Sequence, residues 1–251
     1  MKIQIWSDIV CPWCYIGKRR FEHALETFPH RDQIQVEHQS FQLNPAAERG
    51  VTGSRTDMLR QKYRLSDDQI ATMDERMERL ASEEGLAYNL AATATGNTLD
   101  AHRLVQAAKA HGIGDAMVER LYRAYFTEGR SIFDAESLAA LAAEAGLDAA
   151  EARHVLASDD YATAVADDAR EAAALGATGV PFFVIDGRYG VSGAEASDVF
   201  TQALTQAWAT RVPDGAVGGA SDTSSSGTSA GPSTGPSAVP NAVPSGENPT
   251  D

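Results

Sequence analysis

The sequence has 251 residues, of which 43% are hydrophobic, enough for one large domain or for a domain that carries an inserted one. Its formal net charge of −14 at pH 7 argues against nucleic-acid and anionic-membrane partners, because such a surface would repel both. Charged or polar residues interrupt every apolar run, so we expect neither a secretory signal nor a membrane-spanning helix, and a cytoplasmic location by default.

Residues 1–45 predict a strand, a helix and a second strand. Ile3 and Ile5 alternate with polar neighbours, which is typical of a short strand that ends near residue 6. The following segment predicts an amphipathic helix, with apolar residues spaced along one face: Phe21, Ala24, Leu25 and Phe28. Apolar and polar residues alternate again over residues 34–38, which predicts the second strand. Such a compact unit favours two parallel strands joined by a right-handed crossover.

From about residue 56 to residue 175 the pattern is helical almost throughout. Ser66 and Gln69 predict a capping box, and Gly85 a C-terminal stop for that helix. Asn97 or Thr98 is expected to cap the next helix. Further helices are predicted over residues 117–126, 137–145, 149–156 and 159–175. We therefore predict that residues 46–175 form an inserted helical domain.

After the helical region, the sequence returns to a pattern typical of strands. Residues 182–185 predict a buried strand, Asp186-Gly187 a two-residue hairpin turn, and residues 189–192 the partner strand. An amphipathic helix follows over residues 199–208. The fold class is thus α/β, with residues 1–45 and 176–211 forming one discontinuous domain. Residues 212–251, which are rich in Ser, Gly and Pro, are predicted to be disordered.

The two cysteines, Cys11 and Cys14, enclose Pro12 and Trp13 at the start of the first predicted helix. First-turn N–H groups and the helix dipole would favour a thiolate at Cys11, and Pro12 suits the first helical position. Cys14, one turn further in, is close enough to form a disulfide with Cys11 and should be less exposed. The pattern predicts that Cys11 attacks a partner disulfide and that Cys14 resolves the mixed disulfide.

Other interpretations of the cysteine pair and of its neighbours were weighed. Zinc usually needs four ligands and the sequence has no second CxxC, so no metal is expected. Two inert core cysteines remain an alternative, although the helix-start context would then be a coincidence. Asp8 could help to move protons, but a structural helix cap is the favoured role. No cofactor is expected beyond the redox-active disulfide of Cys11 and Cys14.

A proline at the entrance of a buried strand is the second informative feature. Pro181 lacks the N–H that a central strand needs, so its place before the strand has a positional reason. The order of elements resembles the thioredoxin fold of the DsbA family and, more narrowly, the FrnE-like oxidoreductases. The resemblance spans about residues 1–210 and rests on three segments: SDIVCPWCYIG (7–17), NTLDAHRL (97–104) and GVPFFV (179–184).

The resemblance implies a cis peptide bond before Pro181, which would face the CxxC. The backbone of Val180 would then pair with an extended substrate, as in strand addition. Pro12, Trp13, Val180 and Pro181 are therefore the candidate substrate-binding residues. The resemblance also places Asn97 and His102 near the active site. A structural role is favoured for His102, with substrate contact or tuning of the cysteines as the alternative.

The sequence departs from its relatives at two positions. DsbA has a histidine where Trp13 stands, and indole cannot offer a thiolate a positive charge, so we expect a less oxidising couple. Thioredoxin-like proteins often keep a buried carboxylate six residues before the first cysteine, where this chain has Ile5. The path by which protons move is therefore open.

The function that the sequence favours is thiol–disulfide oxidoreduction, with isomerisation as an added activity. Its partners would be disulfide-containing proteins or small molecules, together with a thiol reductant or oxidant. Kappa-class glutathione transferases and 2-hydroxychromene-2-carboxylate isomerases resemble this architecture and are an alternative. They bind glutathione, and typically carry a serine where Cys11 stands. A non-catalytic chaperone or binding module, with the helical insertion as an apolar platform, is the third hypothesis.

Overall fold

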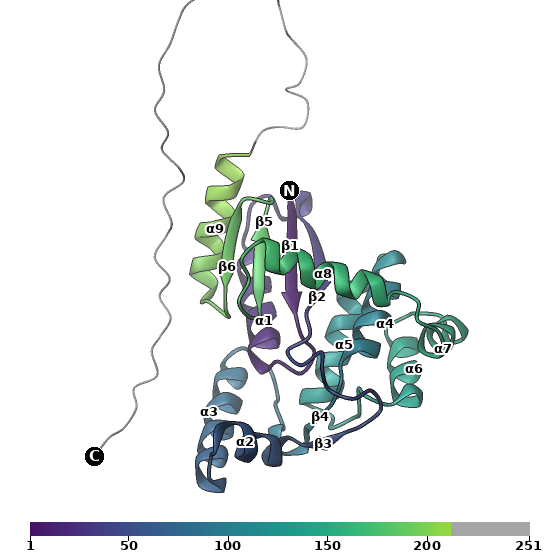
Figure 1. Cartoon of the computed structure of the whole chain (residues 1–251). Helices are drawn as coiled ribbons and strands as arrows, with labels where there is room; N and C mark the ends of the chain where they lie inside the picture. The colour runs from purple at the N-terminus through teal and green to yellow at the C-terminus, as the bar shows by residue number, and fades with distance from the viewer. Residues whose placement is uncertain (212–251) are drawn as a thin grey trace, which may run out of the picture. The chain divides into compact units, whose positions relative to one another are not determined.

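The computed structural model describes residues 1–211, and a four-stranded sheet of order β2-β1-β5-β6 lies at its centre (Figure 1). β1 is parallel to β2 and antiparallel to β5, which pairs with β6 as a hairpin. The elements of this α/β part are β1 (Lys2–Ser7), α1 (Pro12–Glu26), β2 (Gln35–Ser40), β5 (Phe182–Ile185), β6 (Tyr189–Ser192) and α9 (Ser197–Ala209). The parallel strand–helix–strand unit is as predicted.

The helical insertion lies between β2 and β5. Its helices are α2 (Arg55–Tyr63), α3 (Asp67–Glu83), α4 (Leu99–Ala110), α5 (Gly114–Phe126), α6 (Ala135–Glu144), α7 (Ala149–Ala157) and α8 (Ala162–Ala174). It also contains a short antiparallel pair, β3 (Gly53–Ser54) with β4 (Ala94–Thr95), so it is not all-helical as predicted. Strands of two residues are too short to show an alternating pattern.

Residues Met1–Arg211 cluster as one compact unit, so the boundary between the insertion and the α/β part stays a prediction. The predicted disordered tail lies outside the described residues. No helix among residues 1–211 is long and apolar enough to cross a membrane.

Local signals at the ends of elements explain most of these boundaries. Both hydrogen bonds of the predicted Ser66 capping box are present. The N-cap residue of α4 is Thr98, and Asn97 Oδ1, one position earlier, accepts a hydrogen bond from Leu99 N at 2.8 Å. The predicted two-residue turn is one residue longer, because Ile185 pairs with Tyr189 and leaves residues 186–188 between the strands.

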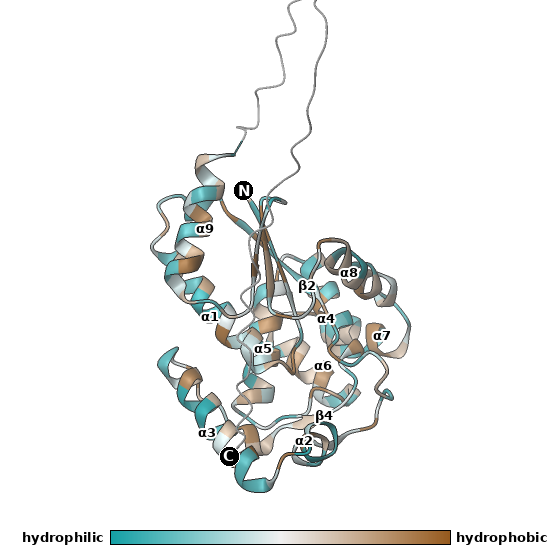
Figure 2. Ribbon diagram, turned by 60° about the vertical axis from the view of Figure 1, so that its left-hand side comes forward, coloured by the Kyte–Doolittle hydropathy of each residue, from teal (hydrophilic) through white to brown (hydrophobic). Residues whose placement is uncertain are grey.

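Apolar side chains cover both faces of the sheet. α1 and α9 lie on one side of it and α8 on the other (Figures 1 and 2). On the first side, Phe21 of α1 and Phe200 of α9 meet Phe183 of β5. On the second, Trp6 of β1 and Phe182 of β5 pack with a residue of α8. The sheet is therefore held between two layers of helices.

The largest buried cluster belongs to the insertion, and it continues into the first turns of α1. Cys11, Cys14, Tyr15 and Ile16 share this cluster with residues of α4, α5 and α6. The start of α1 is thus packed against the insertion, while its later turns pack against the sheet. The CxxC lies where the two packing regions meet.

A fully buried arginine holds the turn between α7 and α8 against α4. Arg103 Nε donates to Asp160 O at 2.7 Å, and its Nη2 donates to Ser158 O at 2.6 Å and to Val155 O. Its Nη1 donates to Asp100 Oδ1 at 2.8 Å. The planar guanidinium supplies donors in a fixed fork that an ammonium cannot copy.

Arg103→Lys should therefore destabilise the protein by about 3 kcal/mol, because buried carbonyl groups lose their donors. Urea denaturation of the purified chain measures this change. Arg153→Lys is the matched control, since Arg153 is exposed on α7 and bonds only to its own helix, at Ala149 O. Equal losses in the two variants would contradict the role given to Arg103.

Candidate active site

Cys11 is the N-cap residue of α1, and Pro12 takes the first helical position, as predicted. Cys11 N donates to Asp8 O at 3.1 Å, and Cys14 N donates to Cys11 O at 3.0 Å. No side chain caps this helix, so the prediction that Asp8 is a helix cap is wrong. The positive end of the α1 dipole is thus directed at Cys11 without a side-chain cap.

The two thiols are both free and both buried. Cys11 is 5% exposed and Cys14 2%, so Cys14 is the less exposed, as expected, but by a small margin. Burial raises the pKa of the Cys14 thiol, and a hydrogen bond with Cys11 and the charge of Cys11 raise it further. Cys14 therefore stays protonated near neutral pH. Cys11, at the helix end, is the thiol placed to attack.

The loop with Pro181, the second feature singled out in the sequence, lies next to Cys11. The Val180–Pro181 peptide bond is cis, and Cys11 Sγ lies 3.7 Å from Val180 O. α1 comes very close to this loop at Gly17. A Cβ at Gly17 would lie 3.0 Å from Pro181 Cγ and 3.3 Å from Ala194 Cα. A methyl group at this position would require the loop to move by a few tenths of an ångström.

Trp13 and Tyr88 lie at the first turn of α1, next to the dithiol. Trp13 is 40% exposed, one of the few large apolar side chains at the surface of residues 1–211. Tyr88 Oη donates to Pro12 O at 2.7 Å and so holds the first turn of α1. We did not predict Tyr88 as a site residue, because it lies in an irregular segment after α3 that carries no motif.

Asp8 and His102 form a buried pair behind the cysteines. Their side chains are 1% and 2% exposed, and His102 Nε2 lies 3.2 Å from Asp8 Oδ1. The other carboxylate oxygen, Oδ2, accepts from Leu43 N at 2.7 Å. Asn97 is not part of this pair: its amide donates to Ala47 O at 2.6 Å and holds a loop. Of the two polar candidates, only His102 reaches the region of the CxxC.

A stack of aromatic rings supports the first turn of α1. Tyr15 lies between Tyr122 of α5 and Tyr88, with ring centroids 4.8 Å and 6.0 Å away. Phe126 completes the group at 4.6 Å from Tyr88. Since Tyr15 follows Cys14 directly, this packing fixes the position of the dithiol relative to the insertion.

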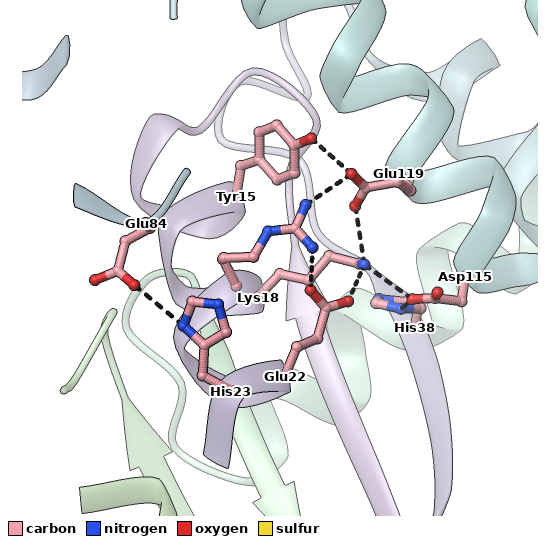
Figure 3. Close-up of polar contacts among 9 residues, drawn as sticks. Tyr15, Lys18, Glu22, His23, His38, Glu84, Asp115 and Glu119 are labelled. Carbon is pink, nitrogen blue, oxygen red and sulfur yellow. Dashed lines mark hydrogen bonds and ion pairs between the residues drawn. The ribbon is translucent and has the colours of Figure 1, made fainter. Parts of the chain in front are cut away.

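An ion-pair cluster ties the same helix to α5 (Figure 3). Lys18 is 4% exposed in its side chain, and its Nζ lies 3.0 Å from Glu119 and 3.2 Å from Asp115, with Glu22 as a third partner. Glu119 also accepts from Tyr15 Oη at 2.7 Å. Lys18 is therefore a buried cation that is fully paired, which is how such a group is tolerated.

Among residues 1–211, no three His, Cys, Asp or Glu side chains are grouped as metal ligands. His38, on β2, pairs with Asp115 of α5 at 2.8 Å. His23 lies on α1 near Glu84, at 3.4 Å.

Gly17→Ala should destabilise the protein by about 1 kcal/mol. Overpacking against Pro181 costs about 1–3 kcal/mol, and the better helix propensity of alanine offsets about 1 kcal/mol of this. Alkylation of Cys11 should also become faster, because the loop that covers it is displaced. Gly190→Ala is the control, since a Cβ there meets only the Phe182 ring at 3.4 Å. Unchanged stability and alkylation in Gly17→Ala would contradict the close contact.

Glu119→Gln should destabilise the protein by roughly 1 kcal/mol at neutral pH, since the side chain is 33% exposed and partly screened. Burial acts to raise the pKa of Glu119, but the charge of Lys18 and the Tyr15 hydrogen bond outweigh it, and the pKa is lowered. The carboxylate therefore stabilises the fold above its unfolded pKa of about 4.3, and loses this effect as pH falls through its folded value.

The difference in unfolding free energy between wild type and Glu119→Gln should thus be largest near pH 7 and shrink on acidification. Urea denaturation across this range measures it. Glu75→Gln, at an exposed position in the middle of α3, is the control and should show no such trend. A constant difference at every pH would contradict the ion-pair account.

This fold is similar to that of known proteins. A family model described as a DSBA-like thioredoxin domain matches residues 2–205. The crystal structure of the probable DsbA oxidoreductase SCO1869 from Streptomyces coelicolor is similar, with 51% identity and a TM-score of 0.82 over 85% of this chain and 92% of that one.

Two more distant proteins are also similar. The uncharacterized protein YwbO of Bacillus subtilis (strain 168) is 27% identical over 205 residues, which cover 81% of this chain and 95% of YwbO. The cytosolic disulfide reductase DsbM of Pseudomonas aeruginosa, solved with GSH, is 22% identical with a TM-score of 0.58, over 83% of this chain and all (100%) of that one, and so shows the fold alone. The narrower FrnE-like resemblance stays a prediction. Because the family match spans residues 2–205, this chain belongs to the family of DSBA-like thioredoxin domains.

Proposed function

We propose that this protein is a thiol–disulfide oxidoreductase that uses Cys11 and Cys14 as its redox-active pair. The observation that carries the proposal is the position of Cys11, at the N-terminus of α1 and 3.7 Å from the carbonyl oxygen that precedes cis-Pro181. A helix N-terminus supports a reactive thiolate there. The 51% identity to a probable DsbA oxidoreductase supports the same activity.

The reaction follows from the different surroundings of the two thiols. In the reducing direction, the Cys11 thiolate attacks a partner disulfide, forms a mixed disulfide and releases one partner sulfur as a thiolate. Cys14 then loses its proton and attacks Cys11 Sγ, which releases the second sulfur. The partner gains two electrons, and the protein keeps a Cys11–Cys14 disulfide. A dithiol reductant returns it to the free-thiol form; with an oxidant, the same steps run in reverse.

The surface around Cys11 suggests how a partner is held. The Val180 backbone is next to Cys11 and is suited to pair with an extended segment, as in strand addition. The exposed ring of Trp13 offers an apolar contact beside it. We propose protein disulfides and small thiols as substrates, and the presence of GSH in the DsbM structure supports the second class. Isomerisation is an added activity that needs the same residues.

We also propose that the protein works in a reducing compartment, the cytoplasm. Structural disulfides are rare in the cytosol, and the only two cysteines of this chain are those of the CxxC. The description of DsbM as a cytosolic disulfide reductase supports a cytoplasmic setting. In such a setting the thiol pair would be kept available for exchange rather than locked as a structural bridge.

Insulin reduction by dithiothreitol should be accelerated by the wild-type protein. Cys11→Ser should reduce the rate to background, because the attacking sulfur is lost. Cys14→Ser should still form the first mixed disulfide and retain it, which mass spectrometry would detect as an added partner mass.

Equal insulin reduction by wild type and Cys11→Ser would contradict the proposal and favour a non-catalytic binding module. Glutathione-dependent activity that survives Cys14→Ser would instead favour a glutathione transferase or isomerase of the kappa-class type.

A further inference from the structure

The loop between β6 and α9 contacts both the Pro181 loop and α1. Gly193, the first residue after β6, donates its N–H to Pro181 O at 2.8 Å, and so extends the pairing of β6 with β5 by one step. A Cβ at Gly17 of α1 would lie 3.3 Å from both Cα and Cβ of Ala194. The position of this loop therefore determines where Pro181 stands relative to α1.

Arg20, on α1, holds the loop through its backbone. Its Nη1 donates to Ala194 O at 2.7 Å, and its Nε donates to Glu84 Oε1 at 2.6 Å. Glu84 is the residue that follows α3, so the arginine joins α1, the end of α3 and the loop after β6. Because the donors of a guanidinium point in fixed directions, the bond to Glu84 orients the group for its bond to the loop.

The Arg20–Glu84 pair is largely shielded from solvent. The two side chains are 18% and 14% exposed. The second carboxylate oxygen of Glu84 lies 3.4 Å from Nδ1 of His23, one turn further along α1 (Figure 3). A hydrogen bond from a charged donor to a carbonyl oxygen is stronger than one between neutral groups, and partial burial strengthens it. Arg20 is thus a firm attachment point for the loop.

A continuous set of contacts runs from this attachment to the attacking sulfur. Ala194 follows Gly193, and the N–H of Gly193 holds the carbonyl group of Pro181. The preceding carbonyl oxygen, Val180 O, lies 3.7 Å from Cys11 Sγ. Loss of the Arg20 bond would therefore loosen the backbone that a partner is proposed to pair with. The cysteines are held separately, by the packing of α1 against the insertion.

Arg19, the neighbouring residue on α1, is bonded in a different way. Its Nη1 donates to Glu22 at 2.6 Å and its Nη2 to Glu119 at 2.8 Å. Both partners lie on helices, Glu22 on α1 and Glu119 on α5. Its side chain is 25% exposed, close to the value for Arg20. The two adjacent arginines are thus similar in burial and in pairing with carboxylates, but only Arg20 bonds to the loop after β6.

We propose that Arg20 is a positioning residue that holds the Val180–Pro181 backbone ready to pair with an extended polypeptide substrate. This rests on the proposed function and narrows it. Arg20 matters for partners that pair along their backbone, and not for small disulfides that need only the sulfur of Cys11. Without Arg20 the loop must be ordered each time a partner binds, and this cost weakens binding. The chemistry at Cys11 stays the same.

Two disulfide probes separate backbone pairing from chemistry. The first is a short extended peptide whose single cysteine carries thionitrobenzoate in a mixed disulfide. The second is the small molecule dithiobis(nitrobenzoate). With the reduced full-length protein in excess, the Cys11 thiolate attacks the peptide sulfur, and the electron pair leaves on thionitrobenzoate, whose absorbance is followed. The rate at different protein concentrations gives a half-saturating concentration and a limiting rate.

Arg20→Gln should raise the half-saturating concentration for the peptide about tenfold, because a charge-assisted hydrogen bond that orders the loop is lost. The limiting rate, and the rate with dithiobis(nitrobenzoate), should stay within about twofold of wild type. Arg20→Lys keeps the charge but not the fork of donors, so its value should lie between those of wild type and Arg20→Gln. Arg19→Gln is the matched control and should behave as wild type with both probes.

A peptide with N-methylated backbone nitrogens on both sides of its cysteine tests the route of the effect. It lacks the donors that strand addition needs, so wild type should bind it more weakly than the unmethylated peptide. Arg20→Gln should then cause little further loss, because the interaction that Arg20 supports is already missing. A further tenfold loss with this peptide would contradict a role in backbone pairing.

The outcomes separate this inference from the proposed function. A wild-type protein that releases no thionitrobenzoate from either probe, or full release by Cys11→Ser, would contradict the oxidoreductase itself. An unchanged half-saturating concentration in Arg20→Gln, or an equal rise in Arg19→Gln, would overturn the positioning role and leave the oxidoreductase intact. Equal losses with both probes would indicate a role in the fold only, and would also overturn the inference. If Arg20→Gln fails to fold, Arg20→Lys decides with the same probes.

Discussion

The packing of the first turn of α1 against the helical insertion is the constraint on which the site depends. Cys11 and Cys14 belong to the same buried cluster as residues of α4, α5 and α6, so the insertion forms one wall of the active site. The stacking of Tyr15 on Tyr122 and the ion pair of the buried Lys18 with Glu119 hold α1 in place against α5. A small shift between α1 and the insertion would therefore move both thiols at once.

This packing gives the two cysteines different chemistry although they are three residues apart. Cys11 stands at the N-terminal end of α1, with its Sγ 3.7 Å from the carbonyl oxygen of Val180. Cys14 lies one turn further into the helix, where burial raises its pKa. One helix turn thus separates an attacking thiol from a resolving thiol. The insertion does more than cover the sheet, because residues of α4, α5 and α6 pack in one cluster with both cysteines.

Local patterns predicted the α/β part well, since strand alternation, the CxxC before a helix and the Val-Pro entry to β5 are each visible within a few residues. The Ser66 capping box was confirmed for the same reason. The sequence could not show contacts between distant segments. Asp8 looked like a helix cap because its partner, His102, lies on a distant helix. Tyr88 and the Lys18–Glu119 pair were missed likewise, and β3 with β4 is too short to leave a pattern.

The central claim is that Cys11 and Cys14 form a reversible dithiol–disulfide couple, and its redox equilibrium with a glutathione buffer tests this most directly. We predict one two-electron transition between the free thiols and an internal disulfide. With Trp13 in place of the histidine of DsbA, its midpoint should lie nearer to about −270 mV than to about −120 mV. Cys14→Ser should abolish it. A protein that forms only mixed disulfides with glutathione across the whole range, in wild type as in Cys14→Ser, would contradict the account.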